Sequence, residues 1–133
     1  MEITEGGCLC GAIRYRINGT PSWSIVCHCR SCRRASAAPS VGWLTVARAD
    51  FTVLSGEPRR FASSPGVLRG FCCDCGSPLT YQNDRSPGTV DITTATLDDP
   101  TRFPPTHEVW LEHRLPWEAD NPQLVACPRD SGG

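Results

Sequence analysis

Short alternations of polar and apolar residues recur along this chain of 133 residues and predict a protein built almost entirely of β-strands. Residues 14–17 alternate strictly, which is typical of a strand that buries one face. Gly and Pro residues separate such segments, as they do in all-β domains. A helix of one or two turns is predicted only over residues 29–35. The further segments predicted as strands are 23–26, 41–46, 51–54, 59–62, 68–71, 79–82, 89–94 and 108–111.

Turn signals and the loss of the apolar pattern set the predicted organisation of the chain. Segments 51–54 and 59–62 are predicted to form a hairpin, because residues 55–58 (Ser-Gly-Glu-Pro) between them are turn formers. Toward the C-terminus the apolar pattern fades. We therefore expect one domain over residues 1–118 and a partly disordered tail over residues 119–133.

The composition indicates a globular protein and argues against several classes. Hydrophobic residues make up 39% and charged residues 20% of the chain, which is typical of a globular domain. The formal net charge is −1, whereas proteins that hold nucleic acid usually carry a strong basic excess. The chain lacks a long apolar run and begins with acidic rather than basic residues. We therefore expect a cytoplasmic protein without a membrane span, a signal peptide or a nucleic-acid partner.

Nine cysteines in tight groups indicate metal binding rather than disulfide bonds. An odd number cannot pair completely, and thiols in a reducing cytosol more often bind metals or take part in catalysis. Gaps of one or two residues within a group suit several ligands of a single ion. The groups are Cys8 and Cys10; Cys27, Cys29 and Cys32; Cys72, Cys73 and Cys75; and Cys127 alone, with Cys73 and Cys127 interpreted as spare thiols.

Two glycine-flanked pairs, Cys8/Cys10 and Cys72/Cys75, are candidates for one structural zinc site with four thiolates. The two-residue gap between Cys72 and Cys75 lets a tight turn aim both sulfurs at one ion. Cys8 and Cys10 would stand about 6–7 Å apart on a straight strand, so the chain must bend at Leu9, as the nearby glycines permit. Zinc here would cross-link distant parts of a small core. The alternative is that some of the four are buried free thiols.

The run of Cys27, Cys29 and Cys32 offers three thiolates within six residues and predicts a second zinc with a different role. Three protein ligands and one open position are the arrangement of a catalytic zinc. Water, a substrate thiolate and His28 are the candidates for the fourth position. Because His28 lies between two ligands, its side chain is expected to point elsewhere.

Arginine residues follow this run closely and offer a counter-charge. Three thiolates and one Zn²⁺ leave a formal charge of −1 (−3 and +2), which would repel an anionic thiol. Arg30, Arg33 and Arg34 can offset this charge, and guanidinium groups also pair bidentately with carboxylates. Arg33 and Arg34 are therefore candidates for binding a thiol substrate that carries carboxyl groups. The alternative is that these arginines form a solvated helix face.

Together the cysteine motifs resemble those of the glutathione-dependent formaldehyde-activating enzyme family, which includes centromere protein V. The resemblance rests on G-G-C-x-C-G from Gly6, on C-H-C-x-x-C from Cys27 and on F-C-x-x-C-G-x-x-L from Phe71. Ser-Ser-Pro-Gly at 63–66 and Pro-Thr-His-Glu-Val-Trp at 105–110 also fit the family.

The resemblance covers about residues 2–118 and implies a fold, two zinc sites and an activity. The implied fold is an all-β, β-tent fold of stacked antiparallel sheets stapled by zinc, with one short helix. The implied activity is that of a carbon–sulfur lyase, which joins glutathione and formaldehyde to S-hydroxymethylglutathione or reverses that step. The implied ligands are Cys8, Cys10, Cys72 and Cys75 for a structural zinc and Cys27, Cys29 and Cys32 for the second zinc.

Such an activity needs a proton for the alkoxide that forms when a sulfur atom attacks a small aldehyde. His107, His28 and a zinc-bound water are the candidates for the proton donor, and the sequence does not decide among them. Trp43, Trp110 and Trp117 either wall the substrate pocket or belong to the core.

Two other functions compete with this enzyme. One is a non-catalytic, zinc-stabilised β domain that binds protein or other ligands, against which stands the open three-thiolate site. The other is a zinc-containing methionine sulfoxide reductase, whose metal cysteines come as two C-x-x-C pairs, whereas the first pair here is C-x-C. The sequence leaves the physiological thiol, the aldehyde and the oligomeric state open.

Overall fold

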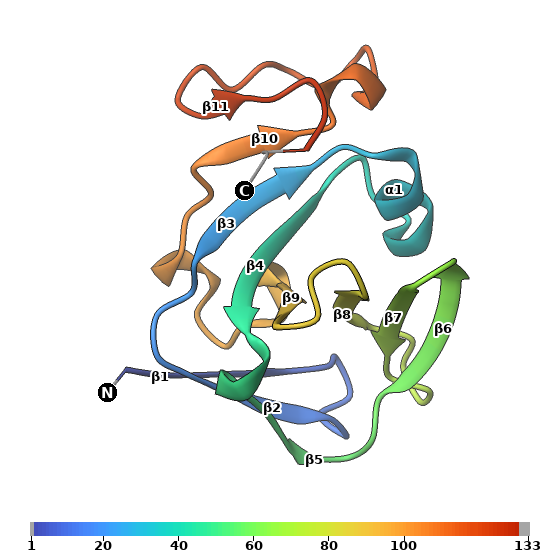
Figure 1. Cartoon of the computed structure of the whole chain (residues 1–133), viewed down its shortest axis with the longest axis vertical. Helices are drawn as coiled ribbons and strands as arrows, with labels where there is room; N and C mark the ends of the chain where they lie inside the picture. The colour runs from blue at the N-terminus through green and yellow to red at the C-terminus, as the bar shows by residue number, and fades with distance from the viewer. Residues whose placement is uncertain (1, 131–133) are drawn as a thin grey trace.

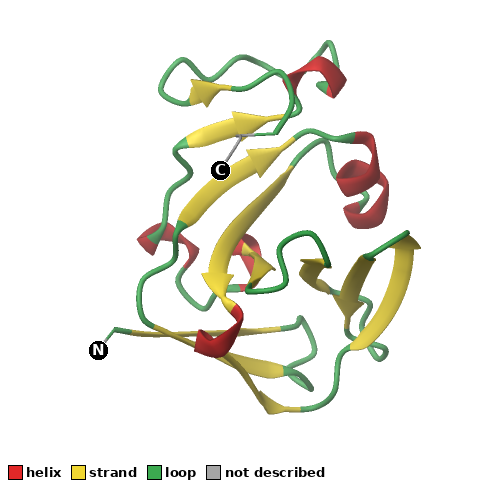
Figure 2. Ribbon diagram, in the orientation of Figure 1, coloured by secondary structure: helices red, strands yellow, loops and turns green. Residues whose placement is uncertain are grey.

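The computed structural model describes residues 2–130, and in this part of the chain eleven strands form two β-sheets beside one α-helix (Figure 1, Figure 2). The predicted all-β fold of stacked sheets with one short helix is confirmed. The smaller sheet is antiparallel, in the order β1 (Ile3–Gly7), β2 (Arg14–Asn18), β5 (Phe51–Ser55). The larger sheet runs in the order β11 (Val125–Ala126), β10 (His107–Val109), β3 (Trp23–Cys27), β4 (Val41–Ala47), β9 (Thr89–Thr93), β8 (Pro78–Asn83), β7 (Val67–Phe71), β6 (Arg59–Ser64).

The α-helix is α1 (Arg30–Ser36), which begins one residue later than predicted. Cys29 is its N-cap, since the sulfur of Cys29 accepts a hydrogen bond from the Cys32 amide at 3.2 Å. The helix ends at Ala37, whose φ of 51° is left-handed. No helix in the described part of the chain is long and apolar enough to cross a membrane. Within residues 2–130, four 3-10 helices complete the structure: η1 (Arg48–Asp50), η2 (Thr94–Thr96), η3 (Pro100–Arg102) and η4 (Leu111–His113).

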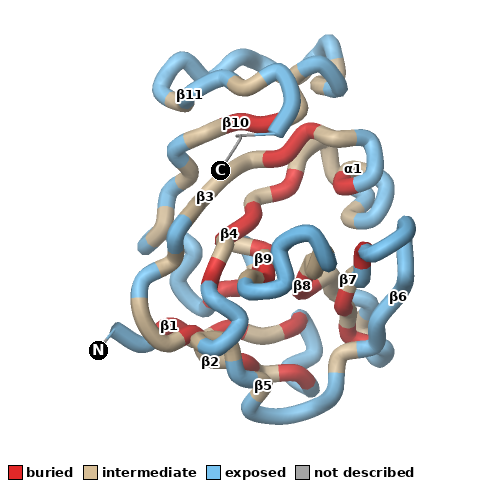
Figure 3. Tube along the Cα trace, in the orientation of Figure 1, coloured by how far each residue is buried: buried red, intermediate tan, exposed pale blue. Residues whose placement is uncertain are grey.

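One face of the larger sheet packs against the smaller sheet and forms the main core. Leu44 of β4 and Ile92 of β9 are almost fully buried there, together with Tyr15 and Ile17 of β2. Each such aliphatic side chain contributes about 1.5–3 kcal/mol relative to an exposed one. Figure 3 shows the buried positions gathered along the middle strands, whereas β6 and the segment around β11 are exposed.

The opposite face of the larger sheet carries a second apolar cluster. Trp43 precedes Leu44 in β4, so alternation along the strand turns its side chain to the other face. There it packs with Cys27, Val41 and Val109, all of which are buried. Helix α1 lies beside the ends of β3 and β4 and across from β7 and β6 (Figure 1). This arrangement places α1 over the second cluster.

The predicted hairpin between segments 51–54 and 59–62 is wrong. Strand β5 pairs with β2 in the smaller sheet, whereas β6 pairs with β7 in the larger one, so residues 56–58 cross from one sheet to the other. The turn itself is real: Gly56 has a φ of 75°, and a Cβ on it would lie 2.4 Å from the carbonyl oxygen of Ala12. A local turn signal does not reveal which sheet each flanking strand joins.

The C-terminal part of the larger sheet departs from the antiparallel pattern. Strand β10 pairs in parallel with both β3 and β11, whereas all other strand pairs are antiparallel in the described residues. Two residues of the predicted tail form backbone hydrogen bonds with the domain. The carbonyl oxygen of Arg129 accepts from the Trp110 amide at 2.7 Å, and the amide of Cys127 donates to the carbonyl oxygen of Glu108 at 2.9 Å. The tail up to residue 130 therefore contacts the domain, and residues 131–133 lie outside the described residues.

Candidate metal centres and the cavity beside them

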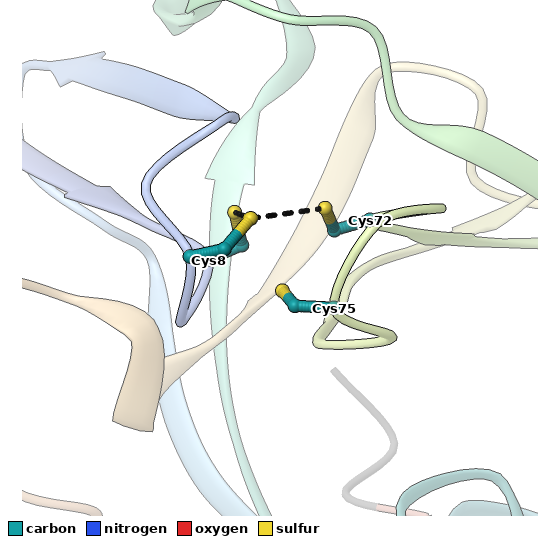
Figure 4. Close-up of side chains that lie close together, drawn as sticks. Cys8, Cys72 and Cys75 are labelled. Atoms are coloured by element: carbon teal, nitrogen blue, oxygen red, sulfur yellow. Dashed lines mark hydrogen bonds between the residues drawn. The ribbon is translucent and has the colours of Figure 1, made fainter.

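Four cysteine sulfurs meet between two turns, one after β1 and one after β7. The sulfurs of Cys8, Cys10, Cys72 and Cys75 all lie within 4.8 Å of one another. The Cys8–Cys10 sulfurs are 3.6 Å apart and the Cys10–Cys72 sulfurs 3.8 Å, and Figure 4 shows Cys8, Cys72 and Cys75 facing one another. Tetrahedral zinc with 2.3 Å bonds to sulfur sets its ligands about 3.7 Å apart. The four residues therefore fit a metal ion.

Hydrogen bonds from the backbone and from Ser77 orient the sulfurs of this four-cysteine cluster. The amide of Ile13 donates to the sulfur of Cys8 at 3.2 Å. Ser77 joins the two turns, since its hydroxyl accepts from the Leu9 amide at 3.0 Å and lies 3.2 Å from the sulfur of Cys75. Hydrogen bonds from the hydroxyl and the amide of Ser77 lower the pKa of Cys75 to about 5. They favour the thiolate, which is the form that binds a metal.

A second cluster forms where β3 runs into α1. Cys27 is the last residue of β3, Cys29 caps the helix, and Cys32 lies in its first turn. The three sulfurs lie within 4.8 Å of one another, and Cys27 and Cys32 are buried. The cap hydrogen bond fixes the sulfur of Cys29 on the same side as that of Cys32.

The charges within this three-cysteine cluster are strongly coupled. Hydrogen bonds from Cys27 and Cys32 lower the pKa of Cys29 to about 2, and the same contacts raise the pKa of Cys27. One thiolate is thus stabilised by two thiols, and further thiolates repel it. A divalent cation removes this repulsion, so the cluster also fits a metal with three sulfur ligands.

Arg69, which no sequence motif singled out, contacts the three-cysteine cluster. Both terminal nitrogens of Arg69 lie 3.8 Å from the sulfur of Cys32. Its guanidinium carbon also lies 5.0 Å from the ring centroid of Tyr81, and its Nε donates to the hydroxyl of Ser63 at 3.1 Å. Its place on β7, three residues before Cys72, was the only signal in the sequence.

The arginines named from the sequence lie around α1. Arg30 lines the cavity beside the three cysteines, whereas Arg34 lines a neighbouring groove with Arg69. The Nε of Arg33 is buried without a hydrogen-bond partner.

The two histidines considered as proton donors lie apart from the cluster's open side. His28 is 1% exposed, and its Nε2 lies 2.9 Å from Oε1 of Glu108, so its ring points to β10. His107 lies 2.7 Å from the Thr106 hydroxyl through Nδ1 and packs edge-on against Trp23. Within the described part of the chain, neither histidine lines the cavity.

A cavity of about 360 Å³ lies beside the three-cysteine cluster. Trp43 and Trp110 line it, the latter with a left-handed φ of 58°, whereas Trp117 is 70% exposed and lies elsewhere. His113, Arg69, Tyr81, Asp91 and Asp130 are among its polar lining residues. The cavity thus combines three sulfurs, aromatic walls and groups of both charges.

A family model matches most of the chain. The model of the glutathione-dependent formaldehyde-activating enzyme family matches residues 3–113. The chain belongs to this family. The resemblance inferred from the cysteine motifs is thereby confirmed. Residues 124–130, which adjoin the cavity through Asp130, lie beyond the region that the family model matches.

Individual relatives agree with the family assignment. A Halomonas elongata protein that bears the family's name is 27% identical over 125 residues, which cover 86% of this chain and 79% of that protein. An uncharacterized lyase of Schizosaccharomyces pombe is 33% identical over 90 residues, which cover 65% of this chain and 64% of that protein. A crystal structure of a Rhodobacter sphaeroides protein has the same fold, with a TM-score of 0.62 at 19% identity over 92% of this chain and 98% of that one.

Proposed function

We propose that this family member is a zinc-dependent carbon–sulfur lyase that forms or cleaves the adduct of a thiol such as glutathione with formaldehyde or a similar small aldehyde. The observation that supports it is the three-cysteine cluster, which borders a cavity instead of being closed by a fourth cysteine. Three protein ligands beside a space for substrate are typical of a catalytic metal site. The cavity of about 360 Å³ has room for a small aldehyde and the cysteinyl part of a tripeptide thiol.

Zinc is the metal that we propose for both clusters, because it binds thiolates tetrahedrally and without redox chemistry. Cys8, Cys10, Cys72 and Cys75 would hold a structural ion, and Cys27, Cys29 and Cys32 would hold the second. When bound at the three cysteines, zinc would lower the pKa of a thiol at its open position and so supply a thiolate at neutral pH.

The chain's own residues would bind and orient the substrates. Arg69 carries a positive charge against the sulfur of Cys32 and reduces the repulsion of an anionic thiol. Arg30 at the cavity and Arg34 in the neighbouring groove, with Arg33 on the same helix, would attract the carboxylates of a glutathione-like substrate. Trp43 and Trp110 would exclude water from the reacting atoms.

Titration of glutathione into the cobalt-substituted protein tests this proposal. A thiolate that joins the three cysteines changes the sulfur-to-cobalt charge-transfer bands, and the apparent affinity falls in high salt because part of the attraction is screened. Cys32→Ala should abolish both the second metal and the change. Arg69→Ala should weaken glutathione binding by about tenfold, equal to ~1.4 kcal/mol, without loss of metal.

The matched control is Arg85→Ala, which removes an exposed arginine away from the cavity and should leave binding unchanged. The double variant Arg33→Ala/Arg34→Ala tests the contribution of the helix. A spectrum that does not respond to millimolar glutathione or to other thiols would contradict the proposal and favour a non-catalytic zinc domain.

A further inference from the structure

A row of side chains crosses the face of the larger sheet that carries the cavity. Thr45 of β4 lies directly opposite Asp91 of β9. Tyr81 of β8 lies opposite Asp91 on one side and opposite Arg69 of β7 on the other. Residues directly opposite on neighbouring strands point to the same face of a sheet. Asp91, Tyr81 and Arg69 accordingly all line the cavity that the three cysteines border.

Among the described residues, Asp91 is a partly buried acidic residue of the cavity wall that pairs with no cation. Its Oδ1 accepts a hydrogen bond from the hydroxyl of Thr45 at 2.6 Å, and none of the ion pairs within residues 2–130 includes it. The guanidinium group of Arg69 is directed to Cys32 and to the Tyr81 ring instead. Burial raises the pKa of Asp91, and the Thr45 hydrogen bond offsets only part of that effect.

The other proton donors near the cluster are less suited to this role. His28 is bound to Glu108, and His107 does not line the cavity. His113 does line it, but this residue is exposed, and its Nδ1 accepts the Arg30 amide at 3.3 Å. A partly buried proton donor that a hydrogen bond holds in place, as Thr45 holds Asp91, is the better arrangement for directed proton transfer.

We propose that Asp91 exchanges the proton at the oxygen of the aldehyde end of the adduct. This inference rests on the proposed function. In adduct formation the sulfur electron pair makes the carbon–sulfur bond, the carbonyl π pair moves onto oxygen, and that oxygen takes the proton from the Asp91 carboxyl group. The incoming thiol releases one proton, which restores the carboxyl group through solvent. Cleavage runs in reverse, with the Asp91 carboxylate accepting the hydroxyl proton.

The direction of the pH dependence follows from these roles. Adduct formation needs the protonated carboxyl group, so its rate falls as the pH rises through the pKa of Asp91. From β4, Thr45 and Trp43 face Asp91, and neither titrates in this range. The other charged or titratable groups that share the cavity are the three cysteines of the cluster, Tyr81, Arg69, Arg30, His113 and Asp130.

The test compares Asp91→Asn with the wild-type protein, both loaded with metal. The introduced asparagine can still accept the Thr45 hydrogen bond but cannot supply the acid. The interconversion of ¹³C-formaldehyde and glutathione with their adduct is followed by NMR exchange between pH 5 and 9. We expect kcat to fall by about 10²–10⁴-fold, with an unchanged KM for glutathione. The fall in rate with rising pH should also be lost. The glutathione response of the cobalt spectrum should be retained.

Two further variants give readouts that a purely structural role would not change. Thr45→Val removes the hydrogen bond that favours the Asp91 carboxylate, so the fall in rate should begin at a higher pH. Asp84→Asn, at an exposed position outside the cavity, should leave rate and pH profile unchanged.

The outcomes separate this inference from the proposed function. If Asp91→Asn binds glutathione and keeps both the wild-type rate and its fall with rising pH, the role of Asp91 is overturned while the proposed function stands. The role of Asp91 is also overturned if the fall in rate with rising pH disappears in His113→Gln but not in Asp91→Asn. If the wild-type protein neither binds a thiol nor interconverts the adduct, the proposed function fails and the role of Asp91 fails with it.

Discussion

The two cysteine clusters use the same ligand atoms in opposite ways. The four-cysteine cluster joins positions that are far apart in the chain, with a separation of 62 residues from Cys10 to Cys72, and it ties a turn of the smaller sheet to a turn of the larger one. The three-cysteine cluster comes from six consecutive residues and borders a cavity. A metal that closes a long loop constrains the whole fold, whereas a metal held by a local run leaves the fold largely unchanged. In the proposed function, this difference in spacing assigns the structural role to the four-cysteine cluster and the reactive role to the three-cysteine cluster.

The largest effect is expected from Cys75→Ser, which opens the four-cysteine cluster. Metal-linked folding energies in small zinc domains are comparable with the stability of a whole domain, so the cooperative thermal transition should be lost. Circular dichroism and metal analysis would measure this. Cys73→Ser is the matched control, because Cys73 lies in the same turn but outside the cluster. Equal melting temperatures for the two soluble variants would contradict a structural role.

A smaller effect is expected from Cys29→Ser in the three-cysteine cluster. Serine is a good N-cap, so α1 should keep its first turn. A local run can also hold metal in the unfolded chain, which reduces the stability that the metal adds to the fold. The melting temperature should fall by about 10 °C or less, with about one metal ion fewer per chain on elemental analysis. Unchanged metal content would show that the second site is misassigned.

A still smaller effect is expected at the buried pair of His28 and Glu108, which lies beside the three-cysteine cluster. Glu108→Ala leaves the buried His28 ring without its partner and should lower the free energy of unfolding by about 1–3 kcal/mol. Urea denaturation measures this difference. Glu112→Ala removes an exposed partner of Arg129 and serves as the control, with an expected effect below about 1 kcal/mol. If both variants have the same stability, the His28–Glu108 contact does not support the site.

The smallest effect is expected at an exposed ion pair near the smaller sheet. Arg14 contacts both carboxylate oxygens of Asp98, and its hydrogen bonds hold the pKa of Asp98 below the usual range. Because the folded-state pKa is depressed, the stabilisation is present above the unfolded pKa of about 4 and is lost as the pH falls through the folded value. Solvent screening limits it to less than about 1 kcal/mol. Asp98→Asn should remove this part of the acid sensitivity of the melting temperature, and a change at neutral pH above that limit would contradict it.

Some strands were predictable because their side chains alternate between buried and solvated faces. Arg14–Asn18 and Val41–Ala47 match their predicted ranges to within a residue. Strand β1 was missed because Ile3–Gly7 lacks a strong apolar alternation. Its position depends on contacts instead: a Cβ on Gly6 would lie 2.4 Å from the hydroxyl oxygen of Tyr15.

The sequence by itself determined the family, the all-β class and the two groups of clustered cysteines, because cysteine spacing and strand alternation are local properties of the chain. Only the tertiary structure decided which strands pair, and hence that residues 56–58 cross between sheets. The tertiary structure also decided which charged side chains lie at the cavity beside the three-cysteine cluster. Arg69 and Asp91 lie far from Cys27–Cys32 in the chain and reach the cavity through the register of β7, β8 and β9, which long-range hydrogen bonds set.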